Sequence, residues 1–360
     1  MSAMELRAAR CRRPGPHRDA TGCDRIGCCG PGREGAGRYG FDVNARMRLG
    51  VASGFCIGAG VAVQARINGA LGARLHDGIA AATVSFGTGL VLLLVAFAVS
   101  GRLRGGVGQV RAAVAEGRLR RWQLLGGLCG AFFVSSQGLT VAAIGVTAFT
   151  VAAVAGQLVS SLVVDRLGLA PSGRTPVTPV RAGAALVAIG AVFLASSGRS
   201  GESPAGLALP ESVREAPHVL LIALPALAGI GLAWQQAVNG RVGEVGGPAS
   251  ATLINFVVGF VALCAVESVV LLTVSGLGEL PTEPWLYLGG VIGVAFIGLG
   301  AVAVRWIGVL LLGLTSVAGQ LIASIVLDLL VPGGPGVSFR VVVGCALILI
   351  ALVLVTRRPD

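Results

Sequence analysis

Lysine is absent from this chain of 360 residues, so all 28 of its basic residues are arginine. This absence excludes a Walker-A phosphate loop and Schiff-base chemistry, because both need a lysine. Histidine is scarce: His17, His76 and His218 lie far apart in sequence and show no metal-ligand spacing. The eight cysteines lie in the N-terminal tail or singly in separate apolar spans, which indicates neither a zinc site nor a disulfide framework. Clustered carboxylates and a nucleophile–base pair are also missing, so we expect no metal, no cofactor and no enzyme activity.

Charged residues are few as well. They make up 12% of the chain, about half the share of an ordinary soluble domain, whereas 54% of the residues are hydrophobic and the mean hydropathy is +0.83. Apolar runs of about 20 residues, long enough to cross a bilayer as a helix, recur along the sequence. The sequence therefore predicts an all-α membrane protein with ten transmembrane helices. Their expected ranges are 48–67, 79–99, 122–141, 146–165, 180–197, 219–238, 251–273, 285–304, 307–328 and 339–356.

The first 46 residues differ from the rest of the chain. They are rich in arginine, glycine, proline and cysteine and show no periodicity. Either they are disordered, or they precede the true start of the protein at Met47. A polar stretch from Ser196 to Pro217 divides the remaining sequence. We therefore expect a tail over 1–46, a first five-helix unit over 47–198, a linker over 199–217 and a second five-helix unit over 218–357.

The two halves repeat the same polar pattern. Ala155-Gly156-Gln157-Leu158 returns 163 residues later as Ala318-Gly319-Gln320-Leu321. In both copies a serine and then an aspartate follow the glutamine at spacing four: Ser161 and Asp165, Ser324 and Asp328. Further pairs match at a nearly constant offset: Gln64 and Asn68 with Gln235 and Asn239; Ser85, Phe86 and Gly89 with Asn255, Phe256 and Gly259; Gly126, Gly127 and Gly130 with Gly289, Gly290 and Gly293. So many matches predict a duplicated membrane unit.

Each expected unit has an odd number of helices. The second unit must therefore enter the membrane in the opposite orientation if both units share one fold. The arginines agree with this inversion, because with a cytoplasmic N-terminus fifteen of them fall in inside loops and five in outside loops. We expect both termini in the cytoplasm, and we attribute the net charge of +11 to this orientation rather than to nucleic-acid binding. Inverted five-helix units are a recurring plan of secondary transporters, whose sites lie near the midplane.

Polar residues within the spans of both units are the candidate site residues. Side chains four residues apart share one helix face, so Gln157 with Ser161 and Gln320 with Ser324 form two matching stripes. A carboxamide in hydrocarbon is costly unless it is paired, so both stripes should face the bundle interior. They are interhelical hydrogen-bonding groups, substrate ligands, or both. The other residues expected to bind substrate or to form a gate are Gln64, Asn68, Gln235, Asn239 and Asn255.

Three carboxylates lie in the expected spans. Asp165 and Asp328 lie near span ends on opposite membrane faces, where a role as interfacial charge or loop anchor is favoured. Glu267 is the only carboxylate well inside a span, which makes it a candidate for proton coupling. Two observations oppose that role: the matching residue of the first unit is Phe97, and Glu267 lies close enough to the outer end to reach the interface.

Three strings carry a family resemblance. They are Gln64-Ala-Arg-Ile-Asn68-Gly-Ala-Leu71-Gly72, Ser85-Phe86-Gly-Thr-Gly89, and Ala155-Gly156-Gln157-Leu158 with Ser161 and Asp165. They resemble the YdcZ-like branch of the drug/metabolite transporter superfamily, here as two copies over about residues 47–356. The resemblance implies ten helices in two inverted repeats around a central cavity, and export of small metabolites or drugs by secondary transport. The second copy departs from the pattern, with Val242-Gly243 for Leu71-Gly72 and Asn255 for Ser85, which predicts an asymmetric site.

Two functions compete at this stage. The first is an alternating-access carrier in the cytoplasmic membrane, an exporter of a small amphipathic or cationic molecule. Its partners would be that substrate, the lipid bilayer and, if Glu267 couples transport, a proton. The alternative is a non-transporting membrane interaction or scaffold protein that retains the transporter fold. The sequence carries no signal of oligomeric state.

Overall fold

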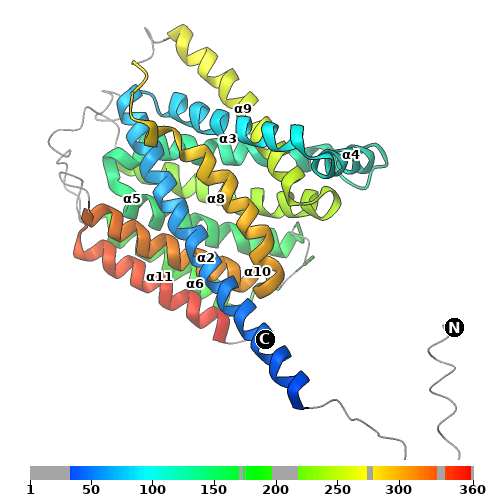
Figure 1. The fold of residues 1–360 in the computed structure, drawn as a ribbon. Coiled ribbons are helices and arrows are strands. Elements are labelled where there is room, and N and C mark those ends of the chain that lie inside the picture. Colours follow the sequence, from blue (N-terminus) through cyan, green and yellow to red (C-terminus); the bar gives the residue numbers. More distant parts are fainter. Residues whose placement is uncertain are drawn as a thin grey trace, which may run out of the picture. The chain divides into compact units, whose positions relative to one another are not determined.

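The computed structural model describes residues 33–169, 173–174, 176–196, 218–273, 279–330 and 337–357. The chain divides into two compact units, Met1–Ala45 and Arg46–Asp360, and the contacts given below lie within the second. Every regular element in the described ranges is a helix (Figure 1). The elements are α2 (Arg33–Leu75), α3 (Gly78–Val99), α4 (Gly101–Ala115), η2 (Arg121–Leu125), α5 (Gly126–Leu167), α6 (Pro179–Ser196), α8 (His218–Gly246), α9 (Pro248–Thr273), η3 (Pro284–Tyr287), α10 (Gly289–Leu330) and α11 (Phe339–Arg357).

Six helical segments of the described chain are long and apolar enough to cross a membrane. Three shorter apolar segments accompany them: Pro179–Leu194, Gly289–Gly300 and Phe339–Ala351. The predicted class, an all-helical membrane protein, is therefore confirmed, whereas the count of ten spans stays a prediction. The bounds of the helices differ from those expected from sequence in two ways. The first helix begins at Arg33, before the expected start at residue 48, and two pairs of expected spans are each joined in one long helix, α5 and α10.

Gly145 divides α5 into two stretches. Its φ of 80° and ψ of 162° are not helical, and only glycine adopts this conformation at little cost. The break lies between the expected spans 122–141 and 146–165. The sequence therefore located the bend correctly, although the helix continues on both sides with almost no loop.

The helix α4 was not expected from the sequence. It follows α3 directly and carries several arginines of the loop that we assigned to the cytoplasm. A Cβ at Gly106 would collide with the backbone oxygen of Gly246, so α4 approaches the end of α8 closely. Val110 and Ala113 are buried there against Val242. This helix thus covers the junction of α8 and α9.

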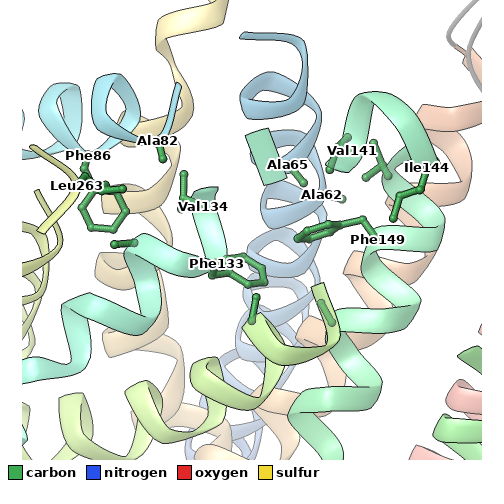
Figure 2. Close-up of a cluster of buried hydrophobic side chains, with 14 of the residues drawn as sticks. Ala62, Ala65, Ala82, Phe86, Phe133, Val134, Val141, Ile144, Phe149 and Leu263 are labelled. Atoms are coloured by element: carbon green, nitrogen blue, oxygen red, sulfur yellow. The ribbon is translucent and has the colours of Figure 1, made fainter. Parts of the chain in front are cut away.

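Two apolar clusters hold the bundle together. The larger cluster includes residues of α2, α3, α5, α8 and α9, among them two pairs of phenylalanines. Figure 2 shows Ala62 and Ala65 of α2 beside Val141, Ile144 and Phe149 of α5, where small side chains allow close approach. The second cluster joins α5, α6, α10 and α11 through residues such as Val154, Leu321 and Ile348. Both clusters therefore join helices of the first half to helices of the second.

Candidate functional site

The glycines of the repeated motif make matching contacts in the two halves. A Cβ at Gly156 of α5 would collide with the backbone oxygen of Ala226 in α8, and a Cβ at Gly319 of α10 with that of Phe55 in α2. One turn away, a Cβ at Gly229 would collide with the backbone oxygen of Ala153, and a Cβ at Gly58 with that of Ser316. Each residue of the first contact is the repeat counterpart of one in the second. The α5–α8 and α2–α10 contacts are thus equivalent.

A second set of matching contacts crosses between the halves. Gly127 would collide with the backbone oxygen of Asn255, and Gly290 with that of Ser85, if either glycine carried a Cβ. At their centre the rings of Phe86 and Phe256, which are repeat counterparts, lie with centroids 5.0 Å apart. The glycines therefore allow α5 to lie against α9 and α10 against α3.

Five of the predicted carboxamide residues, Gln64, Asn68, Gln235, Asn239 and Asn255, fall into two groups. In the group that we call amide cluster I, Gln64 Nε2 donates to the backbone oxygen of Gly289 at 2.7 Å, and Asn68 Nδ2 donates to Gln137 Oε1 at 2.7 Å. Ser85 Oγ lies beside Asn68 Oδ1, since both approach the position of a Cβ on Gly289. This cluster ties α2 to α5 and to the start of α10.

Amide cluster II is the counterpart in the second half. Gln235 Nε2 and Asn239 Nδ2 both donate to Asn255 Oδ1, at 2.8 Å and 3.0 Å. The cluster lies against Gly126 and Gly130 at the start of α5. Gly138, twelve residues further along α5, meets Gly78 beside cluster I. Gln137 of cluster I lies seven residues beyond Gly130 and eleven beyond Gly126, so at 1.5 Å per residue the two clusters lie about 10–17 Å apart along α5.

Gln137 is a site residue that the sequence analysis missed. In cluster II, Asn255 provides the acceptor for Asn239. The residue that matches Asn255 in the first half is Ser85, whose side chain is too short for this role. In cluster I, Gln137 therefore provides the acceptor for Asn68. Gln137 is fully buried, and its Nε2, like Asn68 Oδ1 and Gln235 Oε1, has no hydrogen-bond partner. The signal in the sequence was a lone amide in an apolar span, with glycine (Gly300) at the matching position of the second half.

The repeated glutamines have different surroundings. Gln157 Nε2 donates to Oε1 of Gln236, an exposed neighbour of Gln235 that the sequence analysis also missed, at 3.1 Å. Gln320 is buried, with 7% of its surface exposed. Ser161 and Ser324 each donate to the backbone of their own helix, three residues earlier. None of the described contacts joins Gln157 to Gln320, so it stays a prediction that both side chains face one central cavity.

The repeated aspartates serve as anchors, but with different partners. Asp328 is 6% exposed and accepts hydrogen bonds from the backbone N–H groups of Val146 and Thr147, at 3.0 Å and 2.8 Å. It therefore caps the second stretch of α5 just after the break at Gly145, where a helix N-terminus favours a negative charge. Asp165 instead forms a salt bridge with Arg181 at the start of α6.

Glu267 of α9 is buried, with 8% of its surface exposed. Both of its carboxyl oxygens are sealed from solvent and have no hydrogen-bond partner. It lies one turn beyond Leu263, which packs in the larger apolar cluster. An ionisable group that is sealed from solvent and has no hydrogen-bond partner is unusual for a structural position.

A small cavity of about 210 Å³ opens at the ends of α5 and α8. Its lining includes Trp122, Arg118 and Arg241, and Trp122 stacks on Trp234 with ring centroids 6.0 Å apart. Arg241 is already engaged, because it donates to the backbone oxygens of Gly168 and Leu169. None of the predicted site residues lines this cavity, and it is smaller than the ~300–1,000 Å³ of typical ligand pockets. We do not assign it a substrate.

The apolar helices and their buried amides define a polytopic helical membrane protein. A family model described as "Putative inner membrane exporter, YdcZ" matches residues 49–194 and again residues 220–354, together well over half of the chain. The chain belongs to this family of inner membrane exporters, and the resemblance found in its motifs is confirmed.

Two further comparisons add little. No curated protein matches the sequence. A solved structure titled "Crystal structure of protein" is 18% identical over 87% of this chain and 99% of its own, with a TM-score of 0.46. A similarity of this degree supports no argument about function.

Proposed function

We propose that this protein is a secondary transporter that exports a small molecule across the cytoplasmic membrane by alternating access. Membership of the exporter family supports transport, and the matching contacts of the two halves support the mechanism. In this proposal the first repeat spans 47–198, the second spans 218–357 in inverted orientation, and 199–217 links them. The single observation that carries the proposal is the pair of equivalent crossings, Gly156 on Ala226 and Gly319 on Phe55.

The long helices support ten spans. The helical segment Arg121–Leu167 has 47 residues, and at 1.5 Å per residue it would be about 70 Å long, twice the ~30 Å of a hydrocarbon core. Its break at Gly145 makes two crossings possible. The 42 residues of α10 are likewise too long for one crossing. If α5 and α10 each cross the membrane twice, and α2, α3, α6, α8, α9 and α11 each cross it once, the chain has ten spans.

The aspartates suggest how one side of the protein is closed. In the proposed topology Asp328 lies at the outer end and Asp165 at the cytoplasmic end. Asp328 ties the end of α10 to the second stretch of α5, while Asp165 is held by Arg181. Inverted repeats exchange their conformations between the two states of a transporter. We therefore expect the cap on Val146 and Thr147 to break when the outer side opens.

The side chains available for binding are mainly amides and hydroxyls. The stripes of Gln157 and Gln320 and the two amide clusters would hydrogen-bond a polar group, and Glu267 is the carboxylate that could accept a cationic one. This composition favours a small amphipathic or cationic substrate over an anion. No described arginine lies within either amide cluster.

The test uses purified protein. A thermal-shift screen against a panel of small metabolites identifies a ligand, and counterflow of that ligand in proteoliposomes measures transport. The double variant Gln157→Leu with Gln320→Leu should insert and fold but lose flux, because both carboxamides are removed. Unchanged flux would eliminate these residues as the site. The packed apolar interior also suits the alternative, a scaffold, which predicts no flux and no ligand-induced shift across the whole panel.

A further inference from the structure

Glu267 is a buried ionisable group that no hydrogen bond or salt bridge explains. Its residue is 8% exposed, and both carboxyl oxygens are sealed from solvent without a partner. The other two carboxylates in the spans expected from sequence are engaged, Asp328 by two backbone N–H groups and Asp165 by Arg181. Structural anchoring therefore accounts for those two but not for Glu267.

The described charged groups around Glu267 would not neutralise the negative charge of its carboxylate. Asp77, at the start of α3, is a charged group close to it and has the same sign. Asp77 is itself occupied in capping α3, where it accepts from Ile79 N and Ala80 N. Within the described chain, no ion pair or hydrogen bond joins Glu267 to Arg66 or His76, the other ionisable groups near that turn.

The described side chains of the neighbouring helices supply no cation partner either. Arg74 at the end of α2 is paired with Glu283 at 3.0 Å. The described charged side chains of α5 and α8 lie near the opposite end of α9: Asp165, Arg166, Arg241 and Glu244. The charges of α4 also lie at that opposite end, and the described carboxylate of α10 is Asp328. An ionised Glu267 would thus be an isolated charge in an apolar site, which is very costly. A neutral carboxylic acid is the form that this environment tolerates.

The group is present in one repeat only. The matching residue of α3 is Phe97, which is buried with 6% exposure, so the first repeat has an aromatic core residue where the second has a carboxyl group. A fold that needed only packing here would be satisfied by an apolar residue in both halves. The asymmetry indicates a role that one copy performs for the whole protein.

We propose that Glu267 is a proton-binding site and that the proton is the coupling ion of transport. In the conformation described here its carboxyl O–H is intact. When the contact between α3 and α9 opens to water, the O–H bond breaks, the proton passes to water and the carboxylate stays on α9. One proton is bound and released per cycle. The coupling role rests on the proposed transport function, whereas the proton site does not.

Infrared spectroscopy tests the proton site without a substrate. In proteoliposomes at neutral pH, the wild type should show the C=O stretch of a protonated carboxyl group, and Glu267→Gln should lack it. The matched control Glu279→Gln removes an exposed glutamate and should keep the band. Thermal unfolding verifies that the variants fold, and Glu267→Met provides a second neutral replacement. Identical spectra of wild type and both Glu267 variants would overturn the site.

Flux under an imposed pH gradient tests the coupling. Wild-type flux of the screened ligand should depend on the pH gradient. Glu267→Gln should retain ligand exchange, but its rate should not change with the gradient. Gradient-independent flux in the wild type would refute coupling while leaving transport established. A wild type without flux would overturn transport and the coupling role together, and the infrared band would still decide the proton site by itself.

Discussion

Replacing Asp328 by alanine should release the second stretch of α5 from the end of α10. The side chain caps two backbone N–H groups from 182 and 181 residues away, Val146 and Thr147, and it is buried at 6% exposure. Its removal deletes a helix N-cap, which costs about 0.5–2 kcal/mol. It also leaves buried donors unpaired, at about 1–3 kcal/mol.

These terms overlap, and we expect a local loss of about 2 kcal/mol. Because each 1.4 kcal/mol is a factor of ten, local opening should increase roughly 30-fold. Hydrogen exchange measured by mass spectrometry on the protein in lipid nanodiscs should show this increase in peptides that contain Val146 and Thr147. Asp328→Asn retains one acceptor oxygen and should fall between wild type and Asp328→Ala. Asp165→Ala, the counterpart in the first repeat, should leave these amides unchanged. Equal exchange in wild type and Asp328→Ala would refute the anchoring role, as would an equal effect of Asp165→Ala.

Two further predictions concern packing and the amide clusters. Gly156→Val places a side chain against the backbone of α8 and should destabilise the protein by about 1–3 kcal/mol, whereas Gly183→Ala, which meets open space, should be nearly neutral in thermal unfolding. A Gly156→Val protein as stable as wild type would show that the close approach is wrong. Gln137→Leu should cost about 1–3 kcal/mol by stranding Asn68, and adding Ser85→Asn should restore part of it by copying cluster II. The absence of any rescue in that double variant would show that the clusters are not equivalent.

The repeat made much of this arrangement predictable from sequence. Polar residues that recur in apolar spans had to face other helices, and Gln64, Asn68, Gln235 and Asn239 do so. Asn255 also lies against Gln235 and Asn239, because one short turn joins the two helices that carry them. Internal symmetry therefore identified most of the amides that meet other helices, although not Gln137.

The partners of these residues could not be predicted in the same way. Gln137 has no counterpart in the second half, so the repeat gave no reason to select it. The two aspartates have equivalent positions but different partners, because Asp165 meets Arg181 across the turn into α6 while Asp328 reaches the helix start created by Gly145. Such contacts depend on bends and crossing angles, which a helical pattern does not encode. The helix α4 was missed because its arginines and glycines resemble a loop.

The membrane side on which the segments after α3 and α9 lie tests the inverted repeat most directly. Arg102 and Glu279 are both exposed, and each can be replaced by cysteine in a background without native cysteines. A membrane-impermeant maleimide applied to intact cells should label Glu279→Cys, whereas Arg102→Cys should react only after the membrane is permeabilised. Labelling of both positions from the same side would contradict the inversion of the second half.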